Sequence, residues 1–108
     1  MNRAQWIQYI KKQFGADEEY PWMQYPHYAV FRHRINRKWF ALIMDISKDK
    51  LGLAGNESID VLNVKCDPLL IGSLRMEQGV YPAYHMNKDR WVTVALDGSV
   101  EEQKIKWL

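Results

Sequence analysis

The sequence contains one cysteine, Cys66, among 108 residues, so no disulfide can form within the chain and a reducing environment fits. It has no N-terminal apolar run typical of a signal peptide. It also lacks the run of about 20 apolar residues that a membrane-spanning helix needs. A formal net charge of +2 is too small to indicate a polyanionic partner by itself. Together these absences predict a cytoplasmic protein with no membrane contact.

Motifs for catalysis and metal binding are absent too. There is no Gly-x-Ser-x-Gly elbow, phosphate loop or dinucleotide fingerprint. The histidines are dispersed, without the spacing of zinc ligands: His27, His33 and His85. Cys66 precedes a helix start at Asp67-Pro68, a place where a thiol pKa can be lowered, but no base can be assigned to it. We therefore expect a buried cysteine, no cofactor, no metal and no enzyme activity.

What is present predicts a single α+β domain over residues 1–108, with an ordinary apolar fraction of 47%. Apolar residues at helical spacing predict a first helix that ends at Gly15. Asn2 and Gln5 form a capping-box pattern at its start. The acidic run Asp17–Glu19 is expected to be solvated. The segment Pro21–Pro26 is expected to be an ordered loop because of its prolines and aromatic residues.

After this loop the apolar residues alternate with a period of two, which predicts strands. We expect strands at Ala29–Ile35, Lys38–Ile46, Ser58–Cys66, Val80–Tyr84 and Trp91–Leu96. Asn36-Arg37 is predicted to form a two-residue turn between the first two. A helix is expected from Asp67-Pro68 to about Met76, and a last helix from Ser99, where Glu102 completes a second capping-box pattern.

The run YPAYHMNKDRWVTVALDG, Tyr81–Gly98, and the run YPHYAVFRHRINRKWFALI before it resemble the MmcQ/YjbR (DUF419-type) family of small bacterial proteins. The most specific part is Tyr84-His85-Met86-Asn87-Lys88, followed by Trp91. Pro26-His27-Tyr28 and Asp97-Gly98 also match. The resemblance covers most of the chain, from about Tyr20 onward.

The resemblance implies a frataxin-like (CyaY-like) fold, in which helices pack on one face of an antiparallel sheet. Members of the family are often described as DNA-binding proteins with a double-wing arrangement, a description that rests on analogy of fold. Their final helix is longer and contains a Ser-Tyr pair, whereas this sequence stops at Leu108. Either the final helix is short or the sequence is truncated.

Basic residues gather between the first two predicted strands: Arg32, Arg34, Arg37 and Lys38, with His33 and no acidic residue. Arg32 and Arg34 should share one face of a strand, and Arg37 should lie at the hairpin tip. A protruding basic hairpin can place guanidinium groups on phosphates and reach base edges in a groove. The alternative is a solvated hairpin whose charges protect an exposed strand edge.

A second polar cluster consists of His85, Asn87, Lys88 and Arg90. Beside the basic hairpin it would form one basic surface, with Tyr84 and Trp39 or Trp91 available for stacking. In the alternative, Asn87 caps a turn while Tyr84 and Trp91 pack inward, and for the aromatic residues this core position is the one we expect.

The sequence thus predicts a monomeric, non-catalytic protein that binds double-stranded DNA. The residues expected to contact phosphates are Arg32, Arg34, Arg37, Lys38, Lys88 and Arg90. Iron binding is disfavoured because the first helix, residues 3–14, has no carboxylate. The alternative function is a protein- or peptide-interaction module whose contact patch is the Pro21–Pro26 loop. An enzyme would require a concave pocket around His85 or Cys66.

Overall fold

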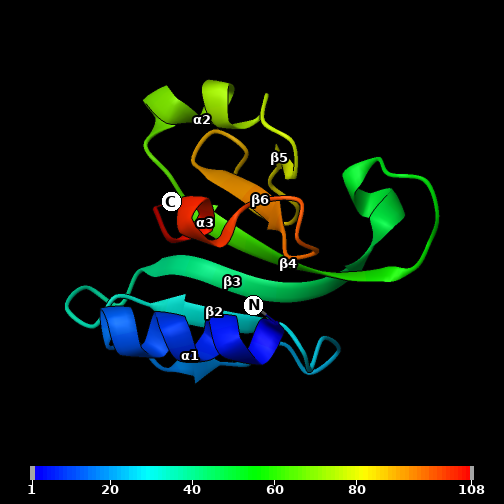
Figure 1. Ribbon diagram of the computed structural model, residues 1–108. Coiled ribbons are helices and arrows are strands. Elements are labelled where there is room, and N and C mark those ends of the chain that lie inside the picture. Colours follow the sequence, from blue (N-terminus) through cyan, green and yellow to red (C-terminus); the bar gives the residue numbers. More distant parts are fainter. Residues whose placement is uncertain (1, 108) are drawn as a thin grey trace.

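The structure, a computed structural model, describes residues 2–107 apart from the side chains of Lys104 and Trp107. Its elements are α1 (Arg3–Phe14), β1 (Glu18–Glu19), β2 (Ala29–Arg32), β3 (Trp39–Ser47), the 3-10 helix η1 (Lys48–Leu51), β4 (Ser58–Lys65), α2 (Pro68–Leu74), β5 (Val80–Pro82), β6 (Trp91–Ala95) and α3 (Glu102–Trp107). The strands form one antiparallel sheet in the order β1-β2-β3-β4-β6-β5. In Figure 1 the segment that contains η1 projects from one end of this sheet. The α+β prediction is confirmed.

Helix α1 has the ends that the sequence predicts. The Asn2 side chain accepts a hydrogen bond from the backbone N–H of Gln5 at 2.8 Å, and the Gln5 side chain accepts one from the backbone N–H of Asn2 at 2.8 Å. Gly15 ends the helix at a φ of 63°, which glycine adopts without strain. Trp6 and Ile10 turn toward the sheet and are buried.

The acidic run after α1 was predicted to be solvated, but part of it joins the sheet. Glu18 and Glu19 form the edge strand β1, which pairs with Phe31 and Val30 of β2. Lys11 of α1 lies 3.2 Å from the Glu18 carboxylate. Since both carboxylates have basic partners, the run can join the sheet without isolated charges at its edge.

The last helix begins later than predicted. Helix α3 starts at Glu102, so Ser99 does not cap it. Instead the Ser99 backbone N–H donates to the Asp97 carboxylate at 3.0 Å, closing the predicted Asp97-Gly98 turn. A capping box would need the same Ser99 N–H as the donor to the Glu102 side chain, so the turn and the capping box are alternatives.

Two apolar clusters cover the two faces of the sheet. On the helix face, strand residues such as Phe31, Ile43 and Val94 pack against all three α-helices. On the other face, residues such as Leu42, Val61 and Trp91 lie beneath loop residues, among them Tyr28 and Ala83. We call this second side the loop face. The prediction that the helices pack on one face is confirmed.

Candidate functional site

The basic hairpin is wider than predicted. Strand β2 ends at Arg32, so Arg34 lies in the connecting turn and does not share a strand face with Arg32. The loop is closed by a hydrogen bond from the His33 N–H to the Lys38 carbonyl at 2.8 Å, with Arg37 at a φ of 61°. The predicted two-residue turn at Asn36-Arg37 is therefore wrong, because a longer loop closes the hairpin.

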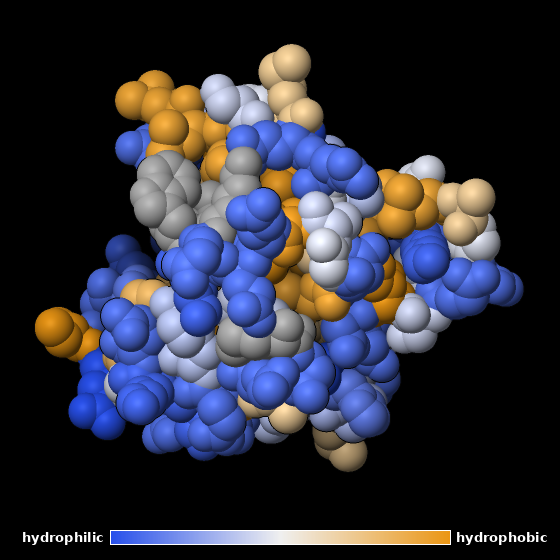
Figure 2. Space-filling view, in the orientation of Figure 1, coloured by the Kyte–Doolittle hydropathy of each residue, from blue (hydrophilic) through white to orange (hydrophobic). Residues whose placement is uncertain are grey.

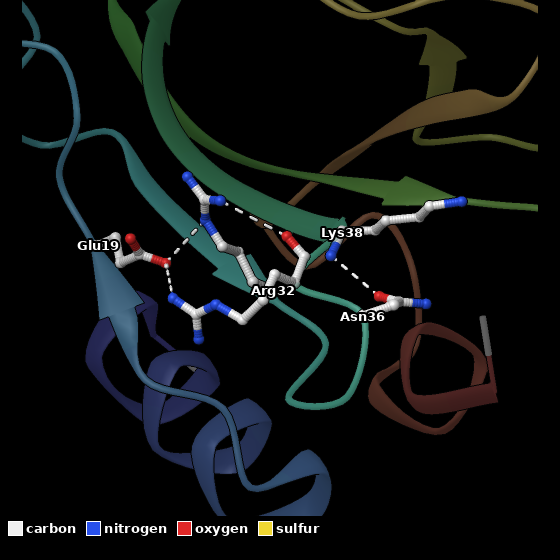
Figure 3. Close-up of polar contacts among 5 residues, drawn as sticks. Glu19, Arg32, Asn36 and Lys38 are labelled. Carbon is white, nitrogen blue, oxygen red and sulfur yellow. Dashed lines mark hydrogen bonds and ion pairs between the residues drawn. The ribbon is translucent and has the colours of Figure 1, made fainter.

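A carboxylate that the sequence analysis did not connect to the hairpin lies against its basic residues. Glu19 of β1 is 2.9 Å from the Arg32 guanidinium and 3.9 Å from that of Arg37 (Figure 3). Arg32 also donates to the Arg37 carbonyl at 3.5 Å. Two of the four predicted phosphate contacts in the hairpin are thus ion-paired within the protein. Their positive charge is partly neutralised before any partner arrives.

The second basic cluster is a capped turn that packs beside strand β4. The Asn87 side chain accepts a hydrogen bond from the Asp89 N–H at 2.8 Å, as the capping alternative predicts. The Arg75 guanidinium, which follows α2, donates to the Lys88 carbonyl. The Arg90 carbonyl accepts from the Cys66 N–H at 2.8 Å, which ties the turn to the end of β4.

Strand register places the two basic clusters at the same end of the sheet. Ala41, near the start of β3, lies opposite Val64, and Lys65 lies opposite Trp91. Strand β4 lies between β3, which follows the hairpin loop, and β6, which follows the capped turn, so these two strands are about 10 Å apart at the usual strand spacing. Within residues 2–107, no carboxylate lies within ion-pair distance of four exposed cations at this end: Arg34, Lys38, Lys88 and Arg90.

On the loop face, two buried polar residues hold the segment with the family-specific motif. Asn63 of β4 and Thr93 of β6 are fully buried and lie opposite each other, and the Thr93 hydroxyl donates to the Asn63 amide oxygen. Asn63 donates its amide N–H to the Tyr84 carbonyl at 2.8 Å. The Thr93 oxygen accepts the Tyr84 N–H at 3.0 Å. Both backbone groups of Tyr84 are thus satisfied inside the fold.

The residue after Tyr84 lies at the rim of a pocket. His85 has a φ of 68°, a backbone conformation that costs a non-glycine residue free energy and that often occurs at functional positions. Its ring centroid lies 6.1 Å from that of Tyr25 and 6.2 Å from that of Tyr28. The motif and the Pro21–Pro26 loop, more than 50 residues apart in the sequence, therefore meet at this point.

This pocket, which we call the aromatic pocket, has a volume of about 250 Å³. It is lined by Trp22, Tyr25, Tyr28, Trp39, Leu42, Met44, His85 and Met86. Burial raises the pKa of the Tyr28 phenol, and the nearby Tyr84 and Asp45 raise it further. The phenol is therefore neutral near pH 7. An enzyme would require a concave pocket around His85 or Cys66, and this pocket lies at His85, but its lining contains no carboxylate or thiol.

The aromatic residues of the motif take the structural positions predicted for them. Trp91 is buried, and Tyr84 is half-buried against the same cluster. Trp39 lies at the pocket wall, with the Arg32 guanidinium 5.8 Å from its ring centroid. Stacking of Tyr84 or Trp91 on a nucleic acid is thus disfavoured, because both rings pack inward.

Cys66 is half-buried after β4 and packs against the helix-face cluster. Burial raises the pKa of its thiol, which is opposite to the lowering that a helix start could produce. The N-cap of α2 is Asp67, whose carboxylate accepts the Leu69 N–H at 3.0 Å. The cysteine lies at the end of a strand, as expected, but it is half-buried rather than buried.

Further surface features were not anticipated. A second hollow of about 250 Å³ lies between α1 and α3, and its lining includes Trp6 and Ile105. Helix α3 continues from this lining to Trp107, whose side chain lies outside the described residues. Figure 2 shows hydrophobic residues at the upper edge of the molecule, where α2 lies, and Leu69 and Met76 are each 88% exposed.

Among the residues that the structure describes, no group of three or more His, Cys, Asp or Glu side chains is arranged to hold a metal ion. Within the same residues, no helix has the length and apolar character needed to cross a membrane.

Sequence reasoning missed the residues that hold this arrangement together: Glu19, Asn63, Arg75 and Thr93. Asn63 and Thr93 gave a signal, since each is a polar residue at a strand position where alternation requires an inward side chain. Glu19 and Arg75 gave none, because their partners depend on tertiary contacts.

Comparison with known proteins shows the family. The model of the YjbR family matches residues 12–108. An uncharacterized protein of Bacillus subtilis, YyaQ, is 39% identical over 105 residues, which are 97% of this chain and 89% of YyaQ. A crystal structure of a Pseudomonas syringae protein is 48% identical, with a TM-score of 0.96 and coverage of 100% of this chain and 92% of that one.

A crystal structure of a Deinococcus radiodurans protein of the DUF419 family model is 24% identical, with a TM-score of 0.68 over 94% of this chain and 71% of that one. At this identity it supports the fold alone. The motif around Tyr84 and the family-model match agree: this chain belongs to the YjbR family.

Proposed function

We propose that the protein binds nucleic acid without catalysis, with double-stranded DNA as the expected form, through the cationic end of its sheet. The observation that carries the proposal is the placement of two basic loops at one sheet end, with four exposed cations that have no acidic partner among residues 2–107. A cytoplasmic location, a monomeric state and the frataxin-like description of the fold are parts of the same proposal.

The proposed mechanism divides the predicted residues into two groups. Arg34, Lys38, Lys88 and Arg90 contact phosphates. Arg32 and Arg37 are held by Glu19 and keep the hairpin in shape. Four phosphate contacts predict a slope of log K against log salt of roughly −3.6 and a non-specific Kd of about 10⁻⁴ to 10⁻⁶ M. Phosphate contacts position a protein on DNA but do not read its sequence.

Fluorescence anisotropy with labelled duplex DNA at several salt concentrations tests this function. The variant Lys38→Ala/Lys88→Ala removes one cation from each loop. Arg3→Ala/Lys48→Ala removes the same charge at the opposite end of the sheet, from residues paired with Asp60 and Glu57, and serves as the matched control. We expect the first variant alone to reduce the salt slope by about 1.8. Equal losses in both variants, or no binding by the wild type at low salt, would reject the proposal.

A second candidate is a protein- or peptide-interaction module that uses the Pro21–Pro26 loop. The observation in its favour is exposure: Met23 is 95% exposed and Tyr25 is 41% exposed, next to the aromatic pocket. Such a module should bind partners with little dependence on salt. Replacement of Met23 by Ser should weaken that binding and leave DNA binding unchanged.

A further inference from the structure

We propose that the aromatic pocket binds a quaternary ammonium group, that is, a fully methylated amine. This inference goes beyond nucleic-acid binding and does not depend on it, because it concerns a different surface and a ligand of opposite charge. It rests on ring geometry, pocket size and the absence of Lys, Arg, Asp and Glu from the pocket lining.

The ring planes around the pocket are not parallel. Trp22 is turned by 81° from Tyr28 and by 83° from Trp39, with centroid distances of 6.1 Å and 5.5 Å. Rings at right angles to one another suit a compact ligand. They do not form the slot between two parallel faces that a flat ring requires.

The nearly parallel rings of Tyr25 and Tyr28 already contact each other and leave no gap between them. The rings of Tyr25 and Tyr28 stack at 4.6 Å with an interplanar angle of 14°. A flat ligand between them would need roughly twice the 3.5–4.0 Å contact distance of carbon atoms. A nucleobase sandwiched by this pair is therefore excluded without rearrangement, and a compact ligand remains.

The electrostatics of the lining select a particular cation. The face of an aromatic ring attracts positive charge, and the pocket lining has no Lys, Arg, Asp or Glu. A primary ammonium is strongly hydrated and would lack carboxylate acceptors there. A quaternary ammonium donates no hydrogen bonds, so it can leave water for a cage of aromatic rings.

The charged groups nearest the pocket include both signs. The Arg32 guanidinium lies 5.8 Å from the Trp39 centroid, but Glu19 is only 2.9 Å from that guanidinium. Asp45 and Lys50 both line the adjoining hollow, which shares Tyr25 and Tyr28 with the pocket. The positive charge of Arg32 beside the pocket is thus partly offset by Glu19, which also lies 3.9 Å from Arg37.

The size also fits. A cavity of about 150 Å³ holds benzene, so a pocket of about 250 Å³ has room for a trimethylammonium group with the first carbons of its chain. The open side allows the rest of the ligand to extend into solvent, since Tyr25 and His85 at the rim are exposed. The ligand is thus either a free methylated amine such as choline or a trimethyllysine side chain.

Calorimetric titration of the intact chain with choline and with its uncharged carbon isostere, 3,3-dimethylbutan-1-ol, tests the inference. We expect millimolar or tighter binding of choline and at least about tenfold weaker binding of the isostere. Equal affinities would show a simple apolar hollow and overturn the proposal. So would preference for adenosine, or no detectable binding of choline at millimolar concentration.

Variants locate the site. Tyr25→Leu should lower choline affinity several-fold, and Tyr25→Phe should preserve it because the ring face remains. Tyr20→Leu is the matched control, since Tyr20 is 49% exposed and does not line the pocket. Equal losses in Tyr25→Leu and Tyr20→Leu would overturn the assignment. All three variants should bind duplex DNA as the wild type does, which separates this proposal from the first.

A peptide with one trimethyllysine, compared with choline, distinguishes the two sources of the group. Binding of the peptide about tenfold tighter than choline indicates a modified protein. Equal binding indicates a free small molecule. Both outcomes require that the same peptide with unmodified lysine binds more weakly, and equal binding of the two peptides would overturn the inference.

Discussion

The two faces of the sheet are built in different ways. The helix face is covered by α1, α2 and α3, and its buried cluster consists of apolar residues. The loop face is covered by irregular segments, and it buries Asn63 and Thr93 beside aromatic rings. Helices satisfy their own backbone hydrogen bonds, whereas a loop over a sheet needs partners from the fold. The covering therefore decides which face has to bury polar groups.

The difference also bears on function. A loop that is held at a few points can leave space beneath it, and the aromatic pocket lies where the Pro21–Pro26 loop meets the segment around Tyr84. The cationic end of the sheet belongs to neither face. Two candidate sites can thus exist on one small domain without sharing their central residues.

The largest loss of stability is expected from a substitution on the helix face. Ile43 is completely buried there, and Ile43→Ala should lower the free energy of unfolding by about 3 kcal/mol, through lost burial and a cavity. Ile35→Ala is the matched control, since Ile35 is 99% exposed and its loss should change stability by less than about 0.5 kcal/mol. Urea unfolding measures both. Similar values would contradict the burial assigned to the helix face.

On the loop face, Asn63→Ala should lower the free energy of unfolding by about 2 kcal/mol, because it leaves the Tyr84 carbonyl and the Thr93 hydroxyl without their partner. It should also shift the NMR signal of the Met86 methyl group, which lies at the pocket, whereas Ile43→Ala should not. Asn56→Ala, at an exposed position, controls for loss of an amide. An equal Met86 shift in Ile43→Ala would show that the two faces are not independent.

A smaller change, an increase in the free energy of unfolding, is expected for a substitution of His85 at the rim of the aromatic pocket. His85→Gly removes the free-energy cost of a positive φ and should raise the free energy of unfolding by about 0.5 kcal/mol. His33 is a matched control because its φ is not positive, so His33→Gly should lower stability. A stabilised His85→Gly variant would mean that the histidine is kept for a reason other than stability. If His85→Gly is instead less stable than the wild type, the positive φ of His85 no longer supports a functional role for this residue.

The comparison of the two faces also explains what could be predicted from the sequence. The helix face follows from local rules: the capping box at Asn2, the helix stop at Gly15 and strand alternation as in Val92 and Val94. The candidate sites do not, because they depend on contacts between distant segments. Glu19 reaches Arg32 only when β1 pairs with β2, and the pocket forms only when Tyr25 meets His85. The family resemblance located the motif but not its anchoring by Asn63.

The smallest effect concerns Cys66, at the boundary of the helix-face cluster. Burial raises the pKa of its thiol in the folded state above that in the unfolded state, so the folded state disfavours the thiolate. The stability that results is fully present below the unfolded pKa, about 8.5, and is lost as pH rises through the folded pKa. Between pH 8 and pH 10, the urea midpoint of the wild type should therefore fall further than that of Cys66→Ala. Tyrosines and lysines titrate in both proteins, so their contributions cancel in this difference.

A thiol-specific reagent at pH 8 should also react more slowly with the folded chain than with the chain in urea. A folded thiol that reacts faster would show that the helix start at Asp67 outweighs burial, and would restore Cys66 as a candidate nucleophile.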